Sequence, residues 1–250
     1  GLSLRLLSYN IRFGGAGREG LLSRVIASCE PELVVLQEAT SPEVVERLAS
    51  ATGMKHWGAL RGNSLAYLSR DPVASALWHK VPFARRRYLE LVLGSGERVF
   101  GVHLSAIHSN VTEQRRVWEI RSLLHNLSAA KLGFHVLTGD FNTLAPGERL
   151  DLRSLPMRLR AIAWMTGRNI RWRTIQLMLG AGYTDGYRML HPEGDAFTFP
   201  TWDPHVRLDY LFLPAPAAGR LHACTIIRDA EGVREASDHF PLLSEIADAA

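Results

Sequence analysis

Short apolar runs, several of them rich in β-branched residues, recur along the whole chain and are separated by turn-forming residues. Runs of this kind are typical of buried or half-buried β-strands. On this basis we expect strands at residues 4–13, 33–38, 64–69, 87–93, 98–104, 135–140, 207–213 and 221–228.

Helical periodicity is confined to residues 21–29, 42–51 and 112–131. The longest of these segments carries apolar side chains from Val117 to Leu127 on one face, as an amphipathic helix does. Strands therefore outnumber helices, and the turn signals "RDPV" and "LGSGER" follow strands too closely for a helical crossover. The pattern predicts an α/β (α+β) protein with mixed β-sheets and helices on their outer faces, folded as a single domain over residues 1–250.

Composition narrows the class of protein. Hydrophobic residues make up 46% of the 250 residues, which is enough for one large core, and no apolar run reaches the roughly 18 residues of a membrane span. The formal charge of +4 favours a polyanionic partner, and no obligate protein partner is indicated. Cys29 and Cys224 make no disulfide framework, so we expect a reducing, cytoplasmic location. A leader removed before Gly1 is the alternative.

One segment imitates a dinucleotide-binding motif. Gly15, Gly17 and Gly20 in "GAGREG" match the spacing GxGxxG between a strand and a helix. In dinucleotide-binding folds the glycines follow the strand directly, whereas Arg12 and Phe13 intervene here, and the later strands offer no second βαβαβ half. A flexible loop is the better interpretation.

Polar side chains stand where the expected apolar strands end. They are Asn10, Glu38, His103, Asp140, Asn142, Asp209, Asp238 and His239. A single residue of this kind is usually a turn former or a hydrogen-bonded rim residue. The whole set is harder to explain in that way, and the carboxylate inside the apolar run "RLDYLFL" must have a partner if it is buried.

The chemistry of this set is coherent. Residues two apart on a strand share a face, so Asp140 and Asn142 point the same way while Phe141 packs on the other side. Carboxylate and carboxamide oxygens suit Mg²⁺ or Mn²⁺, and the scarcity of cysteine argues against a thiolate zinc site. Histidines beside acidic residues can bind an anion or transfer a proton near neutral pH. Together these groups predict metal-assisted hydrolysis of a phosphate ester.

The wording and order of these motifs resemble those of a known family. The segments "SYNIRFGG", "VVLQEA", "GVHLSA", "LTGDFNT", "RLDYLFL" and "SDHFPL" are similar to motifs of the endonuclease/exonuclease/phosphatase superfamily and occur in its chain order, over about residues 8–243. That superfamily includes DNase I, AP endonucleases, neutral sphingomyelinases and inositol polyphosphate 5-phosphatases. The resemblance implies a DNase I-like four-layer αββα sandwich and a metal-dependent phosphoesterase activity.

The resemblance also implies roles for individual residues. Glu38 and Asp238 match the groups that hold Mg²⁺, or Mn²⁺ in its place, and Asn10 matches a metal ligand or a water-mediated neighbour of the metal. Asp140 and Asn142 match the pair that orients the attacking water and the phosphate, with Asp140 as the candidate base.

Two histidines complete the catalytic set that the resemblance implies. Asp209 and His239 match a carboxylate–histidine dyad, in which the carboxylate holds the imidazole in one tautomer. His103 matches a second histidine, which binds the phosphate or protonates the leaving oxygen.

The sequence leaves the substrate open between several phosphate esters. The segments typical of abasic-site endonucleases and of inositol 5-phosphatases are missing, whereas Arg12 matches an arginine near the scissile site of DNase I. A nuclease acting on DNA or RNA is therefore favoured. The alternative is a sphingomyelinase or phospholipase C-like enzyme, or another phosphoesterase acting on lipid headgroups or inositol phosphates.

An arginine- and tryptophan-rich stretch follows the "GDFN" motif, and we expect it to form a helical insertion at about residues 150–181 near the mouth of the site. Its side chains suit a nucleic-acid backbone with stacked bases. They suit an anionic lipid surface equally well, and simple solvation is the third reading. The residues expected to bind substrate are Arg12, Arg158, Arg160, Arg171, Trp202 and Arg207.

Overall fold

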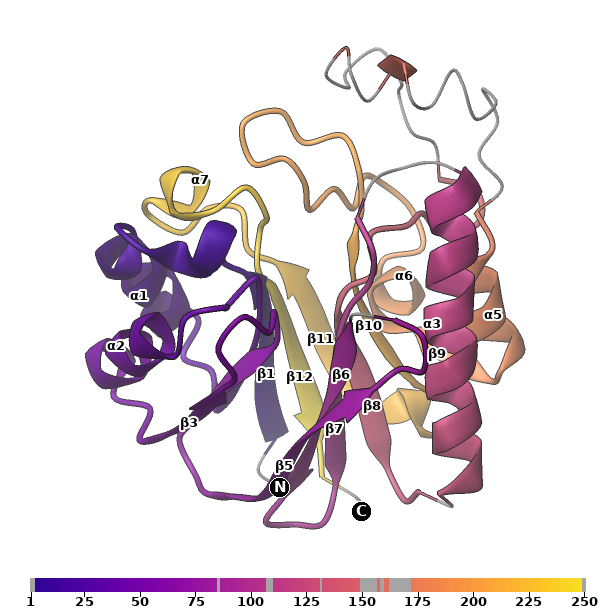
Figure 1. Ribbon diagram of the computed structural model, residues 1–250, viewed down its shortest axis with the longest axis horizontal. Coiled ribbons are helices and arrows are strands. Elements are labelled where there is room, and N and C mark those ends of the chain that lie inside the picture. The colour runs from indigo at the N-terminus through magenta and orange to yellow at the C-terminus, as the bar shows by residue number, and fades with distance from the viewer. Residues whose placement is uncertain are drawn as a thin grey trace.

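Two six-stranded β-sheets lie face to face, and helices cover their outer faces (Figure 1). The computed structural model describes residues 3–84, 86–106, 110–130, 132–148, 157, 160–161 and 172–248. Each sheet contains both parallel and antiparallel pairs. The architecture is the αββα sandwich that the family resemblance implies.

The first sheet has the strand order β11-β12-β1-β2-β4-β3. Strands β1 (Ser3–Asn10) and β2 (Leu33–Gln37) are parallel neighbours in its centre, and the other pairs are antiparallel. β2 is buried along its whole length, which explains why its sequence "LVVLQ" is apolar without alternation. The flanking strands are β3 (His56–Ala59), β4 (Ala66–Ser69), β11 (Leu221–Ile226) and β12 (Leu242–Ala247).

The second sheet has the strand order β5-β6-β7-β8-β10-β9. Strands β7 (Arg98–His103) and β8 (His135–Asp140) are its parallel pair, with the longest helix between them in the chain. The expected hairpin at "LGSGER" is confirmed, since β6 (Arg87–Leu93) pairs antiparallel with β7. The remaining strands are β5 (Val73–Lys80), β9 (Tyr183–Asp185) and β10 (Asp209–Pro214).

Helices cover the two outer faces separately (Figure 1). On the first sheet lie α1 (Glu19–Ser28), α2 (Pro42–Thr52) and α7 (Val233–Ala236), and on the second lie α3 (Asn110–Ala129) and α5 (Thr174–Gly180). Shorter elements are α6 (Gly186–Leu190) and the 3₁₀ helices η1 (Phe13–Gly15) and η3 (Ala215–Arg220). Within the described residues, no helix combines the length and the apolar character needed to cross a membrane.

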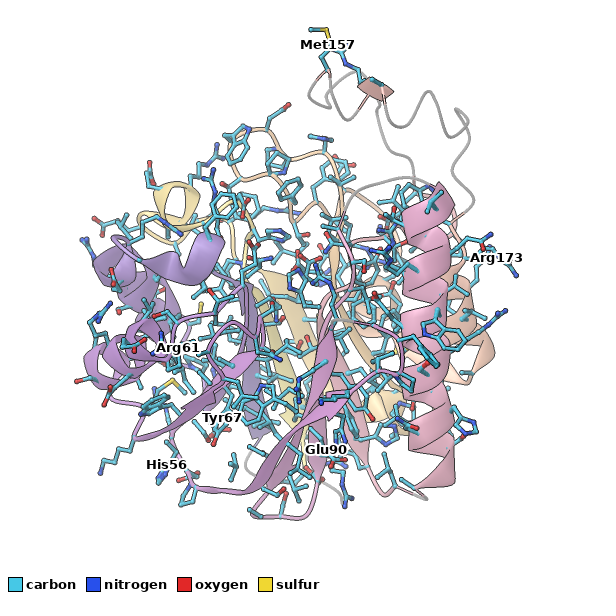
Figure 2. The ribbon with its side chains drawn as sticks, viewed as in Figure 1. His56, Arg61, Tyr67, Glu90, Met157 and Arg173 are labelled. Carbon is cyan, nitrogen blue, oxygen red and sulfur yellow. The ribbon has the colours of Figure 1, made fainter. Side chains whose placement is uncertain are left out.

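Side chains fill the spaces between the layers (Figure 2). One apolar cluster joins residues of both sheets, such as Val35 and Val99, and continues beneath α1 and α2. A second cluster, with Phe100 and Ile120 among its members, lies between the second sheet and α3. The sheets approach closely at Gly101 of β7, where a Cβ atom would lie 2.8 Å from Cγ1 of Val35.

Several expected boundaries differ from those observed, for local reasons. The run predicted over residues 4–13 ends at Asn10, because Arg12 and Phe13 adopt left-handed φ angles of 56° and 47°. The turn "RDPV" does not join a hairpin, since β4 belongs to the first sheet and β5 to the second. The strands β3, β5, β9 and β12 lie outside the runs that we expected.

The glycine-rich segment forms a packed turn. A Cβ atom on Gly15 would lie 3.0 Å from side-chain atoms of both Ile11 and Leu22, so the turn into α1 requires a glycine there. The strand next to β2 is the antiparallel β4, so the β1–α1–β2 unit does not continue into a dinucleotide-binding half. Of the expected insertion at residues 150–181, the described part is Met157, residues 160–161 and the segment from Trp172 onward, which includes α5.

Candidate active site

Polar side chains gather where the two parallel strand pairs end. Asn10 ends β1, Glu38 follows β2, His103 ends β7 and Asp140 ends β8. In the second sheet, His103 and Asp209 each lie directly opposite Asp140 on a neighbouring strand. Residues in register on neighbouring strands point to the same side of a sheet. The sheet itself therefore places an imidazole and a second carboxylate beside Asp140.

Asp140 is the centre of this cluster. Its Oδ2 accepts a hydrogen bond from Nδ2 of Asn10 at 3.1 Å, and its Oδ1 accepts from the backbone N–H of Asn142 at 2.9 Å. Oδ2 also lies 3.6 Å from Nε2 of His103 and 3.5 Å from Nε2 of His239. Burial raises the pKa of Asp140 to about 7; His239 opposes this rise, and the nearby Asp209 adds to it.

The backbone around Asp140 is shaped by its neighbours in "GDFN". Gly139 has a φ of 146°, and a Cβ atom there would lie 1.9 Å from the carbonyl oxygen of Val102. Only glycine fits at that position. Asn142 adopts a left-handed φ of 50°, and its Nδ2 donates to the carbonyl of Leu104 at 2.9 Å, which fixes the side chain at the pocket wall.

His239 is held between two carboxylates. Its Nδ1 lies 2.8 Å from Oδ2 of Asp209, so the ring presents Nε2 toward Asp140. The backbone of Asp209 is itself fixed, because Oγ1 of Thr198 accepts from its N–H at 3.3 Å. Burial alone would lower the pKa of His239, but Asp209 and Asp140 outweigh it and raise the pKa to about 10. The imidazole is therefore charged at neutral pH.

His103 lies on the other side of Asp140 and has the opposite electrostatic character. Burial, together with the nearby charges of Arg86 and His239, lowers its pKa well below the usual value, so the ring is neutral. Oγ of Ser64 accepts a hydrogen bond from the N–H of Glu38 at 2.8 Å and forms a second hydrogen bond with Nδ1 of His103. The hydroxyl proton of Ser64 is thus free to point at Nδ1, which leaves the ring proton on Nε2, facing Asp140.

An acidic group beside this cluster could hold a metal ion. Ligating atoms of Glu38, Asp238 and His239 lie within 4.8 Å of one another, and Glu38 and Asp238 are half-buried at the pocket wall. Hard oxygen donors of this kind fit a divalent cation such as Mg²⁺. Burial raises the pKa of Asp238. The charge of His239 opposes this rise, and the charge of Glu38 adds to it. A cation between the two carboxylates would relieve this repulsion.

A second group of possible ligands fits a metal less well. Asp140, Asp209 and His239 also have ligating atoms within 4.8 Å of one another, but all three are fully buried and the two carboxylates already contact the imidazole. Of the two groups, the one with Glu38 and Asp238 is the better candidate for a cation site. The side chain of Asn10 accepts from the N–H of Arg12 through Oδ1 at 3.0 Å and donates to Asp140 through Nδ2.

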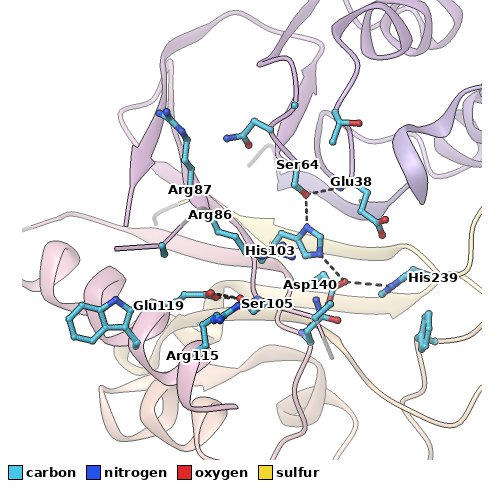
Figure 3. A pocket seen from close by; sticks show the side chains of 18 of the residues that line it. Glu38, Ser64, Arg86, Arg87, His103, Ser105, Arg115, Glu119, Asp140 and His239 are labelled. Atoms are coloured by element: carbon cyan, nitrogen blue, oxygen red, sulfur yellow. Dashed lines mark hydrogen bonds and ion pairs between the residues drawn. The ribbon is translucent and has the colours of Figure 1, made fainter. Parts of the chain in front are cut away.

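The pocket at this edge of the sandwich has a volume of about 880 Å³ (Figure 3). Glu38, His103, Asp140 and His239 are gathered at one end of it, as Figure 3 shows. Asn142 and Asp238 also line it. Pockets of about 300–1,000 Å³ are typical of ligand sites, so there is room for more than one phosphate group.

The expected substrate-binding residues are placed very differently from one another. Arg12 lies at the rim, with Nε 3.7 Å from Oδ2 of Asp238 and its guanidinium 5.6 Å from the ring centre of Trp202. Trp202 is 60% exposed and Phe13, which also contacts Arg12, is 79% exposed. These three side chains form an open aromatic and cationic rim.

Arg207 does not reach the pocket. It is only 1% exposed and forms ion pairs with Asp185 and with Glu148, the latter at 2.8 Å. A paired and buried guanidinium braces the structure beneath the site, so the expectation that Arg207 binds substrate is corrected. Arg160 is exposed, whereas Arg158 and Arg171 lie outside the described residues. Arg173 points away from the sheets at the outer edge of the molecule (Figure 2).

Several residues of the site carry no signal in the sequence. Ser64, which links Glu38 to His103, follows a polar turn and is part of no recognisable motif. Glu119 of α3 accepts from the N–H of Ser105 at 3.1 Å and from its hydroxyl, and so fixes the segment that follows His103. Both depend on contacts between segments far apart in the chain, which periodicity does not reveal.

The fold and this site together define a hydrolase that acts on phosphoester bonds. The chain belongs to the endonuclease/exonuclease/phosphatase family, whose model matches residues 7–239. No curated protein sequence matches the chain.

Solved structures share the fold along nearly the whole chain. One is a 3′ phosphatase from Neisseria, bound to a product DNA hairpin, with a TM-score of 0.72 and 20% identity, covering 98% of this chain and 100% of that one. A 3′-5′ exonuclease from Neisseria meningitidis has a TM-score of 0.72, 19% identity and the same coverage. An AP endonuclease from Archaeoglobus fulgidus has a TM-score of 0.71, 19% identity and again the same coverage. At such identities the likeness shows the fold.

Proposed function

We propose that the protein is a Mg²⁺-dependent phosphodiesterase that hydrolyses nucleic acid. The observation that carries this proposal is the position of Asp140. Its carboxylate lies within 3.6 Å of one neutral and one charged imidazole, next to the acidic pair Glu38 and Asp238. A base, two hydrogen-bond donors for a phosphate and a cation site thus meet in one pocket.

The roles of the side chains follow from their protonation states. Asp140, whose pKa is raised to about 7, is a base matched to neutral pH and would take a proton from the attacking water. His239 carries a positive charge and would donate through Nε2 to an oxygen of the phosphate, where negative charge develops. His103 is neutral and would donate a hydrogen bond from Nε2 to the same group.

Two further groups hold this arrangement in place. Asp209 fixes the orientation of the His239 ring, so that the charged Nε2–H is aimed before the substrate arrives. Asn142 binds Leu104 through its nitrogen, which leaves its side-chain oxygen to orient a water or a phosphate-bound group. A divalent cation held by Glu38 and Asp238 would supply a Lewis acid that offsets the charge of the phosphate.

Nucleic acid is the preferred substrate class on two grounds. The net charge of +4 favours a polyanion, and the rim formed by Arg12, Phe13 and Trp202 offers a cation beside exposed rings, which suits a phosphate next to a base. Structural neighbours include a phosphatase bound to a DNA hairpin and an AP endonuclease, which agrees with this choice.

A substrate panel tests the proposal. Plasmid DNA, single-stranded DNA and RNA, sphingomyelin, an inositol phosphate and bis-p-nitrophenyl phosphate are each incubated with the protein in Mg²⁺ and in EDTA. We expect Mg²⁺-dependent cleavage of a nucleic acid. Hydrolysis of sphingomyelin with inert DNA and RNA would replace the proposal by a lipid phosphodiesterase, and hydrolysis that survives EDTA would remove the metal from the account.

A further inference from the structure

The pocket extends well beyond the catalytic cluster, to an end with different chemistry. Its far wall is formed by the β5–β6 connection with the first residue of β6, and by α3, which contribute Phe83, Arg86, Arg87, Arg115 and Trp118. We call these five residues the arginine end. Figure 3 shows Arg87 and Arg115 on the side of the pocket opposite Glu38 and His239, with Arg86 beside His103.

In the described part of the chain, the three arginines of the arginine end have no ion-paired carboxylate. Arg86 donates to the carbonyl of His103 at 3.2 Å, and Arg87 donates to the carbonyl of Trp78 at 3.4 Å. Over the described residues, no carboxylate forms an ion pair with Arg86, Arg87 or Arg115. Glu119, which also lines this wall, is buried, and its carboxylate accepts hydrogen bonds from the N–H and the hydroxyl of Ser105. Three guanidiniums that share one pocket, with no ion pair to a described carboxylate, form a site for an anion.

Two aromatic side chains lie exposed in the same place. Trp118 is 48% exposed, and its Nε1 donates to the carbonyl of Pro82 at 3.1 Å, so α3 and the β5–β6 connection fix the indole ring between them. Phe83 is fully exposed and adopts a left-handed φ of 59°. Exposed rings beside guanidiniums form the combination that binds nucleotides, because the rings stack on bases and the cations bind the backbone.

The two ends of the pocket are therefore lined by side chains of opposite charge. Glu38, Asp140 and Asp238 line one end, and the three arginines line the other, with His103 and Ser105 between them. A phosphate bound at the acidic end needs a cation, whereas a phosphate at the arginine end does not. The two ends thus suit two different phosphates of one molecule.

From this arrangement, and on the basis of the proposed function, we propose that the arginine end binds an unpaired nucleotide next to the scissile phosphate. Arg87 and Arg115 hold its phosphate, and Trp118 and Phe83 stack on its base. The base must be unpaired, because base pairing and stacking within a duplex cover the faces that these rings would contact. The protein is accordingly selective for single-stranded nucleic acid, or for strand ends that can be opened.

The test compares an oligonucleotide with a substrate too small to reach the arginine end. Specificity constants are measured with saturating Mg²⁺ for a single-stranded oligonucleotide, its duplex and bis-p-nitrophenyl phosphate. The variants are the double substitution Arg87→Gln/Arg115→Gln, and Trp118→Ala with Trp118→Phe as the conservative partner. Arg121→Gln is the matched control, since Arg121 is an exposed arginine of α3 that does not line the pocket.

For the wild type, we expect a higher specificity constant on the single strand than on the duplex. In the double variant the KM for the single strand rises about 10- to 100-fold, while kcat changes much less, because a contact away from the reacting atoms contributes to binding. Trp118→Ala raises the KM about 10-fold and Trp118→Phe restores it. Arg121→Gln behaves as the wild type does.

Salt dependence supplies a second readout that a merely structural role would not move. In the inactive Asp140→Asn background, the slope of log affinity against log salt becomes shallower by about 0.7 in the double variant, because one phosphate is no longer neutralised. If the wild type cleaves nucleic acid but the double variant keeps the wild-type KM and salt slope, the proposed role of the arginine end is contradicted and the proposed function stands. Equal activity on duplex and single strand would do the same. A wild type that hydrolyses no nucleic acid would overturn the proposed function itself, and the arginine end with it.

Discussion

Oδ2 of Asp209 lies 2.8 Å from Nδ1 of His239, and the opposite nitrogen of the same ring faces Oδ2 of Asp140 at 3.5 Å. The ring is thus held in one orientation by a carboxylate that itself lies opposite Asp140 in the strand register. This arrangement aims a positive charge at the place where we expect the phosphate to bind.

Replacement of this orienting carboxylate should affect kcat far more than KM. Asp209→Asn can present an N–H to Nδ1, which favours the wrong tautomer and removes the charge that keeps His239 protonated. We expect kcat to fall by about 10²- to 10⁴-fold, as measured in steady-state kinetics. Asp229→Asn, at an exposed position, is the matched control and should have no effect. Wild-type kcat in Asp209→Asn would remove the dyad from the mechanism.

The activity should rise with pH through the neutral range. Asp140 works as a base only when it is ionised, and burial raises its pKa to about 7, so protonation switches the site off at lower pH. A cation bound nearby stabilises the ionised form, so the midpoint should lie at about 7 or below. His239, with a pKa raised to about 10, should stay charged across this range. The profile of kcat/KM between pH 5 and 9 checks this, and a maximum at pH 5 would contradict it.

The acidic pair should bind a divalent cation without any substrate. We expect Glu38→Gln to weaken Mn²⁺ binding by at least about 10-fold in isothermal titration calorimetry, because a neutral carboxamide offers a poorer ligand. Glu46→Gln, on the exposed face of α2, serves as the control. Wild-type Mn²⁺ affinity in Glu38→Gln would move the cation to other residues.

The strand that carries Asp140 should not tolerate a side chain at Gly139. The alanine Cβ would lie 1.9 Å from the carbonyl oxygen of Val102 in the neighbouring strand, so β7 and β8 would have to separate. We expect a loss of about 3 kcal/mol or more in the free energy of unfolding, and a melting temperature lower by roughly 6–12 °C or more. Gly94→Ala, where the new Cβ meets no atom within 4 Å, should melt close to the wild type. Equal melting temperatures would show that the strands yield easily.

The apolar pattern predicts mixed sheets with helices on their outer faces and the identity of the central polar residues, because both leave local signals. The αββα arrangement of the layers follows from the resemblance of the motifs to a known family. A fully buried strand such as β2 is apolar throughout, and "LTGDFNT" departs visibly from that pattern at Asp140 and Asn142. The edge strand β5 was missed because most of its positions are only partly buried, and strong alternation is absent.

Contacts between distant segments could not be predicted. The motif order groups Asn10 with the acidic residues that could hold a metal. The structure shows its side chain hydrogen-bonded to Asp140 and to the backbone N–H of Arg12. Arg207 follows an aromatic loop as a substrate-binding residue would, yet it is buried between Asp185 and Glu148. The arginine end unites the β5–β6 connection with α3, and neither segment has a motif.

The most direct test of the account is the hydrolysis of a labelled single-stranded oligonucleotide by wild-type protein and by Asp140→Asn, each in Mg²⁺ and in EDTA. The substitution keeps the shape of the side chain but replaces one accepting oxygen by an NH2 group, so a melting curve is recorded to show that the variant is folded. We predict rapid cleavage by the wild type in Mg²⁺ alone, and a rate at least about 10³-fold lower for Asp140→Asn. Near-normal Mg²⁺-dependent cleavage by a folded Asp140→Asn protein would contradict the account.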